Sequence, residues 1–279
     1  MIKSILLAVD GSMYTDAVLK HGIDLAKKLK AHLRVYSVVD VRIYEWVLNT
    51  GGEGYMPVIP SNVFHDESFK FHNERADALL KVIGTKLTES GVSYETGKEE
   101  GSPVEVICDL ARQVDLLIMG ARGDYARWGD RLLGATLESV SRQSQVPVMI
   151  VDKAYQEFRC IICAYDRSEG SSAALKLSAF MSGSLNLPLE ILTIHDNEME
   201  RKLVLEEAKK YLEPYDLEVQ YRHEAGDASE ILVQSTHDSP ESAVLLMGSY
   251  GHSRLREAIL GSTTVHVMRN ATKPIILVR

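Results

Sequence analysis

Two halves of this chain repeat the same sequence blocks in the same order, and this internal repeat limits the possible folds more than any other feature. Five blocks recur: Ile5–Ser12 with Ile161–Ser168, Leu33–Val39 with Leu189–His195, Glu100–Ile107 with Ala225–Leu232, Leu116–Gly120 with Val244–Gly248, and Val146–Val151 with Lys273–Val278. Repetition of this kind indicates a duplicated structural unit. We therefore predict two domains, residues 1–153 and 158–279.

Within each repeat, short apolar runs alternate with helical patterns. The apolar runs are continuous in Val, Ile and Leu, as expected for strands that are buried on both faces. Strands alternating with helices predict a parallel sheet covered by helices on both sides, with right-handed crossovers. The fold class is therefore α/β, with two tandem, doubly wound domains of five parallel strands each. The final strands, Pro147–Val151 and Pro274–Val278, would pair the domains by covering each other's exposed edges.

The first repeat carries an insertion, residues 41–66, that the second largely lacks. It contains Tyr44, Trp46 and Tyr55 among Gly and Pro residues. Two interpretations stay open: a surface excursion, or a flap over a ligand site or a subunit contact.

Composition excludes several classes of function. The net charge of −8 over 279 residues leaves no basic excess for non-specific binding of nucleic acid. The longest apolar runs are too short to span a membrane, and the N-terminus has no signal-peptide layout, so we expect a cytoplasmic protein without a membrane partner. Cys160 and Cys163 form a C-x-x-C within a predicted strand, where their thiols would point to opposite faces.

A glycine-rich turn in the second half is typical of a phosphate site. Gly248-Ser-Tyr-Gly251 follows an apolar strand and precedes Gly261-Ser262 by nine residues. Glycine lets a ligand approach the backbone, and a helix N-terminus offers free N–H groups to an anion. We expect Ser262 and Thr263 to add hydroxyl donors at the N-cap of this helix. His252 is either a phosphate contact or a surface loop residue.

The position of the site follows from the topology. Ligands of open parallel sheets bind at the carboxyl ends of the strands, where strand order reverses. If the first and fourth strands of the second half are neighbours, Asp166 joins the glycines in one crevice.

The first half repeats this set imperfectly. Its candidate residues are Asp10, Val39, Gly120, Gly123, Gly134 and Thr136. Ten residues, rather than nine, separate Gly123 from Gly134, and Ala135 stands where the second half has Ser262. One extra residue would turn the helix N-terminus by about 100° unless the loop absorbs it.

These motifs resemble the universal stress protein family in its tandem two-domain form. The turn fits the family signature G-x2-G-x9-G-S/T, and Ala8-Val-Asp10 and Ala164-Tyr-Asp166 resemble the family's opening strand. The resemblance implies an adenine-nucleotide α-hydrolase-like fold, pairing through the last strands, and a stress-response role. It also implies ATP as ligand, with or without Mg²⁺. Asp166 and the main chain at Ile194 would border the adenosine, and Gly248, Gly251, Gly261 and Ser262 would hold the phosphates.

Three functions remain open: an ATP-binding regulatory protein, a slow ATPase or phosphoryl-transfer enzyme, and a nucleotide-free scaffold that binds another small molecule. Phosphoryl transfer needs a positioned nucleophile and charge stabilisation. The sequence has no Walker lysine and no recognisable base, so we favour binding and assign no catalytic residue and no metal site. The protein would be either a homodimer or a monomer whose two halves form a pseudo-dimer.

Overall fold

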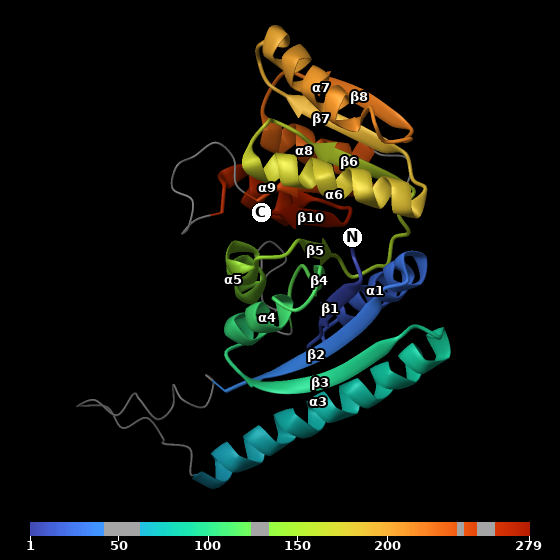
Figure 1. Cartoon of the computed structure of the whole chain (residues 1–279). Helices are drawn as coiled ribbons and strands as arrows, with labels where there is room; N and C mark the ends of the chain where they lie inside the picture. Colours follow the sequence, from blue (N-terminus) through green and yellow to red (C-terminus); the bar gives the residue numbers. More distant parts are fainter. Residues whose placement is uncertain (42–61, 124–133, 239–242, 250–259) are drawn as a thin grey trace, which may run out of the picture.

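The computed structural model describes residues 1–41, 62–123, 134–238, 243–249 and 260–279 (Figure 1). Most of the predicted insertion, including its aromatic residues Tyr44, Trp46 and Tyr55, lies outside these ranges. None of the helices in the described ranges is both long and apolar enough to cross a bilayer.

Strands and helices alternate through both halves as the repeat predicts. The first half contains β1 (Ser4–Ala8), α1 (Thr15–Leu29), β2 (His32–Asp40), α3 (Asn62–Ser90), β3 (Tyr94–Gly101), α4 (Pro103–Ala111), β4 (Leu116–Gly120), α5 (Ala135–Gln143) and β5 (Val148–Val151). The second half contains β6 (Cys160–Ala164), α6 (Glu169–Leu185), β7 (Leu189–Ile194), α7 (Glu198–Leu212), β8 (Val219–Glu224), α8 (Ala228–Asp238), β9 (Ala243–Gly248), α9 (Ser262–Asn270) and β10 (Ile275–Val278).

All ten strands form one sheet, in the order β3-β2-β1-β4-β5-β10-β9-β6-β7-β8. Within each half the pairings are parallel, and the halves meet where β10 pairs antiparallel with β5, Ile276 opposite Met149. The predicted α/β class and the pairing through the last strands are therefore confirmed. Figure 1 shows this joint near the middle of the molecule, with α3 and α7 at opposite ends.

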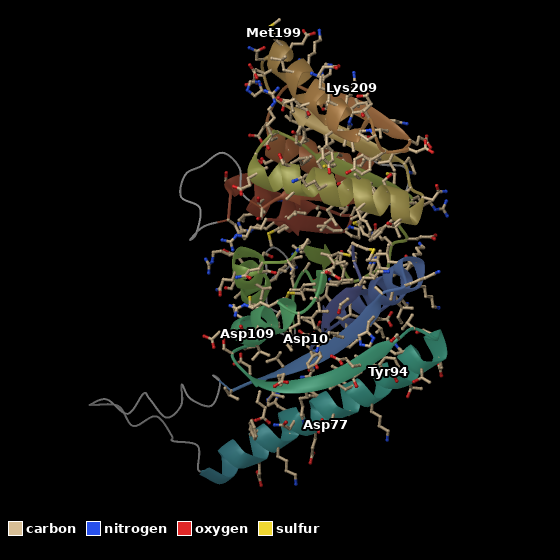
Figure 2. The ribbon with its side chains drawn as sticks, viewed as in Figure 1. Asp10, Asp77, Tyr94, Asp109, Met199 and Lys209 are labelled. Atoms are coloured by element: carbon tan, nitrogen blue, oxygen red, sulfur yellow. The ribbon has the colours of Figure 1, made fainter. Side chains whose placement is uncertain are left out.

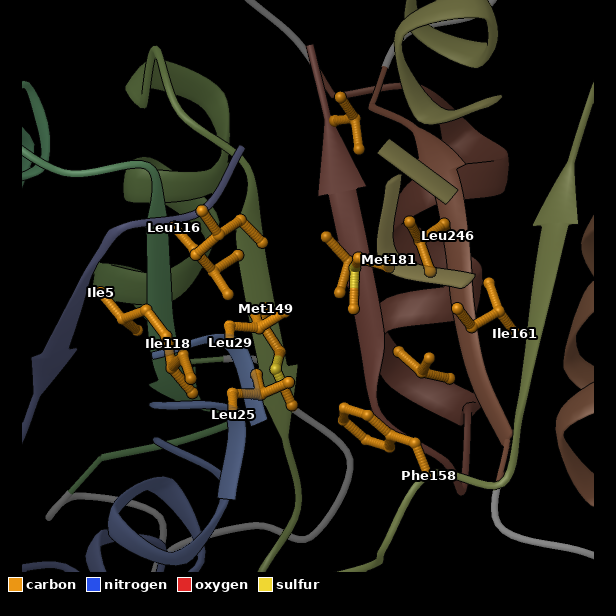
Figure 3. Packing of buried hydrophobic residues seen from close by; sticks show 14 of the residues in the cluster. Ile5, Leu25, Leu29, Leu116, Ile118, Met149, Phe158, Ile161, Met181 and Leu246 are labelled. Carbon is orange, nitrogen blue, oxygen red and sulfur yellow. The ribbon is translucent and has the colours of Figure 1, made fainter. Parts of the chain in front are cut away.

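Helices cover both faces of the sheet, and each layer crosses the joint between the halves. Buried residues of α1, α3, α6 and α7 belong to one apolar core, and those of α4, α5, α8 and α9 belong to the other. Figure 3 shows core side chains from both sides of the joint, including Met149 and Leu246. Because each core contains residues from both halves, burial of apolar surface stabilises the pairing as well as the single domains.

The duplication is visible in backbone details that a sequence alignment cannot show. Lys30 and Asn186 end α1 and α6 in the left-handed conformation, with φ of 53° and 52°. Gly11 and Arg167 occupy equivalent loop positions with φ of 76° and 68°. An arginine at such a φ is unusual, because a Cβ is crowded there.

The strand prediction for the two cysteines is also confirmed. Cys160 and Cys163 lie on β6 and neither forms a disulfide in the described part of the chain, with Cys163 in one core and Cys160 packed against the other. Burial raises the pKa of the Cys163 thiol to about 12, which makes it unreactive at neutral pH.

A short segment between β5 and β6 lies against α1. The His21 ring of α1 stacks on Phe158 with centroids 5.4 Å apart and is tilted against Tyr155 at 4.8 Å. The Gln156 N–H donates to His21 Nε2 at 3.4 Å, and Gln156 Nε2 donates to the carbonyl of Thr272 in the second half at 3.1 Å. The segment is thereby attached to both halves.

Candidate functional site

Each half has one place where strand order reverses. β1 pairs with β2 on one side and with β4 on the other, and β6 pairs in the same way with β7 and β9. The helices that follow β1 and β6 cover one face of the sheet, and those that precede β4 and β9 cover the other. Folds of this topology bind ligands in a crevice at the carboxyl ends of the central strands, at the point where the strand order reverses.

In the first half, three of the predicted residues come together in this crevice. Asp10, labelled in Figure 2, follows β1 and accepts hydrogen bonds through Oδ1 from Ser12 N–H at 2.9 Å and Thr15 Oγ1 at 3.5 Å. A methyl group at Gly123 would lie 2.9 Å from Asp10 Oδ2, so the two residues are neighbours. The Gly134 N–H donates to the carbonyl of Ala121 at 3.4 Å.

Gly120, which ends β4, is tightly enclosed. A methyl group there would approach Tyr14 Cβ to 2.5 Å. Tyr14 is buried at the N-cap of α1, where the second half has Gly170. The end of β4 therefore rests against a large side chain in the first half, which the sequence pattern did not single out.

The second half brings Asp166 and Gly248 together through the first turn of α6. Asp166 Oδ1 accepts from Ser168 N–H at 3.0 Å, and the Asp166 N–H donates to Ser171 Oγ at 3.3 Å. A methyl group at Gly248 would lie 2.8 Å from the backbone of Gly170 and Ser171. Only a residue without Cβ lets β9 end this close to the helix.

One detail of the predicted helix start is wrong. The N-cap of α9 is Gly261, with an extended backbone (φ −58°, ψ 145°), so Ser262 and Thr263 are the first two helical residues. Their hydroxyls therefore do not occupy the capping position. Glycine satisfies the backbone requirement of the N-cap but has no side chain to accept the first-turn N–H groups, which leaves those donors to other partners.

Thr264 belongs to the candidate site, although its sequence pattern does not single it out. It is buried, and its Oγ1 donates to the carbonyl of Ser249 at 3.1 Å. This bond ties the first turn of α9 to the glycine turn after β9. The only available signal was its position three residues after Gly261, the spacing at which a helical residue faces its own N-cap.

The extra residue of the first half does not shift its helix. α5 and α9 are both nine residues long and begin directly after an extended glycine, Gly134 or Gly261. Ala135 therefore takes the place of Ser262, and Thr136 that of Thr263. The loop itself, together with Gly251 and His252 of the second half, lies outside the described residues.

The helix N-termini differ in charge. The first turn of α5 carries Glu138, whereas the first turn of α9 has no acidic residue. A carboxylate near a helix N-terminus competes with an anionic ligand for the same positive potential. An anion at the N-terminus of α9 would therefore meet no carboxylate from the first turn of that helix, in contrast to α5.

Both glycine turns are held by the strands of the joint. The Ala121 N–H donates to the Val151 carbonyl at the end of β5, and the Ser249 N–H donates to the Val278 carbonyl at the end of β10, both at 2.8 Å. These bonds link each crevice directly to the pairing of the two halves.

Val39 and Ile194, the remaining predicted residues, lie on β2 and β7. These strands are two positions away in the sheet from β4 and β9, which precede α5 and α9. Val39 of β2 is buried and pairs with Glu100, and Ile194 ends β7 opposite Glu224. Next to them, the Tyr165 N–H donates to the Leu192 carbonyl at 3.0 Å, and Thr193 Oγ1 donates to the Tyr165 carbonyl at 3.0 Å. The backbone at the ends of β6 and β7 is thus rigidly connected.

Comparison with known proteins agrees with this geometry. A model of the universal stress protein family matches residues 1–152 and 194–279. Universal stress protein Slr1230 of Synechocystis sp. is 28% identical over 292 aligned residues, covering all of both chains. Universal stress protein MJ0531 of Methanocaldococcus jannaschii is 30% identical over 160 residues, covering 56% of this chain and 86% of its own.

A solved structure shares the whole fold. The crystal structure of a universal stress protein from Archaeoglobus fulgidus superposes with a TM-score of 0.76 at 22% identity, covering 99% of this chain and 98% of the other. Since the family model matches most of the chain and a relative aligns from end to end, the chain belongs to the universal stress protein family.

Proposed function

We propose that this protein binds ATP in the crevice of its second half and acts as a regulatory nucleotide-binding protein. The observation that carries the proposal is the arrangement of Gly248, Gly261 and the N-terminus of α9, whose first turn has no acidic residue. The spacing of these glycines also fits the family signature.

The phosphates would bind to backbone amides. The first helical hydrogen bond of α9 runs from the Val265 N–H to the Gly261 carbonyl, at 3.0 Å. The amides of Ser262, Thr263 and Thr264 precede it and belong to the group that a helix leaves without internal partners. They would donate to phosphate oxygens, with Gly251 and His252 as further proposed contacts from the adjoining loop. Asp166 and the main chain at Ile194 would border the adenosine.

ATP hydrolysis is the second candidate function, after ATP binding without hydrolysis. Binding needs only the amides and the helix dipole, whereas hydrolysis also needs a positioned water and charge stabilisation in the transition state. A steady turnover well above about one per minute, removed by a substitution in the site, would favour the ATPase alternative.

The first half is proposed as a weaker site of the same kind, formed by Asp10, Val39, Gly120, Gly123, Gly134 and Thr136. Its convergent glycines favour binding, and Glu138 opposes it. Denaturing gently purified protein and quantifying the released nucleotide distinguishes the cases. About one nucleotide per chain indicates one working site, about two indicates both, and none favours the scaffold.

Substituting Gly261→Val should reduce ATP affinity at the second site at least about 100-fold and leave the fold intact. Valine accepts the extended backbone of Gly261, and the nearest atom to an added Cβ, Thr264 Oγ1, is 3.6 Å away. The side chain would instead occupy the space beside the first-turn amides. Isothermal titration calorimetry measures the affinity and stoichiometry. Unchanged values for both, in a variant with wild-type thermal stability, would show that the site has been assigned wrongly.

A further inference from the structure

Arg201 is an unusual residue near the proposed site. It lies in the first turns of α7 and is only 9% exposed, although it carries a permanent charge. Its Nη1 donates to the carbonyls of His195 and, at 3.0 Å, Asp196, and its Nε donates to His223 Nδ1 at 3.2 Å. A buried guanidinium requires such partners, because an unsatisfied charge would be costly.

Two of the three acceptors of Arg201, the carbonyls of His195 and Asp196, belong to the turn that follows β7. The His195 N–H also donates to the Glu224 carbonyl at 3.1 Å, and the Asn197 N–H donates to His195 Nδ1 at 3.0 Å. Asn197 in turn caps α7 by accepting from the N–H groups of Met199 and Glu200. Arg201 thus sets the orientation of a backbone turn that begins directly after Ile194.

The same helix is also connected to the loop after β6. Arg167, in the left-handed conformation, pairs with Glu207 at 2.8 Å and with Glu200 at 3.6 Å. Arg167 directly follows Asp166. Helix α7, whose residues Met199 and Lys209 are labelled at the end of the molecule in Figure 2, therefore holds the loops after both β6 and β7.

The distance between strands shows which part of a nucleotide would meet this turn. If the phosphates lie at α9 beside β9, the end of β7 is two strands away, about 10 Å. That separation corresponds to the length of a nucleoside, so the base would lie against the turn after β7. Arg201 faces this turn and does not lie at the α9 N-terminus.

We propose that Arg201 is a positioning residue for the nucleoside end of the second site, fixing the turn against which the base rests without contributing to phosphate binding. This inference rests on the proposed function. In the first half, the residues that follow β2 lie outside the described ranges. We therefore assign a positioning residue of this kind to the second half alone.

The test compares ATP with inorganic triphosphate, which lacks the nucleoside. Calorimetry on the full chain should show that Arg201→Gln weakens ATP binding about 10-fold or more and changes triphosphate affinity less than about 2-fold. Arg201→Lys should recover part of the ATP affinity, since an ammonium cannot reach all three acceptors in the same geometry. Lys202→Gln is the matched control. Lys202 is exposed and pairs only with Glu198 among the described residues, so both affinities should stay unchanged.

The affinities of the wild type and the variants for ATP and triphosphate distinguish a failure of the positioning role from a failure of the proposed function. If the wild type binds neither ligand, the proposed function fails and the positioning role fails with it. If the wild type binds both and Gly261→Val loses both, but Arg201→Gln keeps the wild-type ratio of the two affinities, only the positioning role is wrong. A purely structural role would lower thermal stability and leave that ratio unchanged. Should Arg201→Gln not fold, the ratio measured for Arg201→Lys decides in the same way.

Discussion

Lowering the pH from 7 to 4 should destabilise the wild-type protein by about 3 kcal/mol more than a His21→Leu variant. His21 is only 1% exposed, and burial lowers its pKa from 6.5 to about 4. Its imidazole is held neutral between the rings of Tyr155 and Phe158 and accepts the Gln156 N–H. Leucine is the matched replacement, because Leu177 occupies the equivalent position in the second half.

The protein loses stability at low pH because the folded and unfolded states bind different numbers of protons at His21. In the unfolded chain His21 takes up a proton below pH 6.5, whereas the folded protein resists protonation until about pH 4. Between these values the unfolded state binds more protons, so the free energy of unfolding falls as the pH falls. Above pH 6.5 both states are neutral at this residue, and its contribution is constant.

Urea unfolding of both proteins at several pH values measures this difference. Carboxylates titrate in both, so the gap between the two curves isolates His21. His237→Asn, which removes an exposed imidazole of α8, should reproduce the wild-type curve. Parallel curves for wild type and His21→Leu would mean that His21 is charged in the folded protein or accessible to water.

Gly248→Ala should lower the free energy of unfolding by about 2 kcal/mol, while the chemically identical change Gly261→Ala should alter it by less than about 0.5 kcal/mol. The added methyl group at Gly248 would lie 2.8 Å from the Gly170 carbonyl carbon and the Ser171 nitrogen. These are backbone atoms in the first turn of α6, and they can retreat only if the helix shifts. At Gly261 the nearest atom is 3.6 Å away, an ordinary contact.

Chemical denaturation with both alanine variants provides the comparison, since both glycines belong to the same crevice and undergo the same change. Both changes restrict the unfolded chain alike, so equal changes in stability would show that the contact with α6 does not determine the effect. A shift of α6 would also disturb Asp166, whose N–H is bonded to Ser171 Oγ, so we expect nucleotide affinity to fall in Gly248→Ala as well.

The two crevices have the same topology but are lined by different residues. Tyr14 closes the end of β4 in the first half, where Gly170 stands in the second, and Glu138 lies in the first turn of α5. Both glycine turns are bonded to the ends of β5 and β10, the strands that pair the two halves.

The repeated blocks were sufficient to predict the strand and helix order, the parallel pairing within each half, and the convergence of Asp10 with Gly123. Buried strands need continuous apolar runs, and the carboxyl ends of neighbouring parallel strands must meet at one edge of the sheet. These are local or topological requirements, and so the order of residues expresses them directly.

Other features depend on contacts between distant residues, which periodicity does not encode. The N-cap at Gly261 was decided by the backbone entering α9 rather than by the hydroxyl of Ser262. His21 is neutral because a segment about 135 residues away covers it. Arg201 is buried because the turn after β7 and His223 of β8 supply its acceptors. The sequence by itself determined the repeated α/β plan and the edge where a ligand would bind. Only the tertiary structure decided how each crevice is enclosed, because enclosure depends on close packing between elements far apart along the chain.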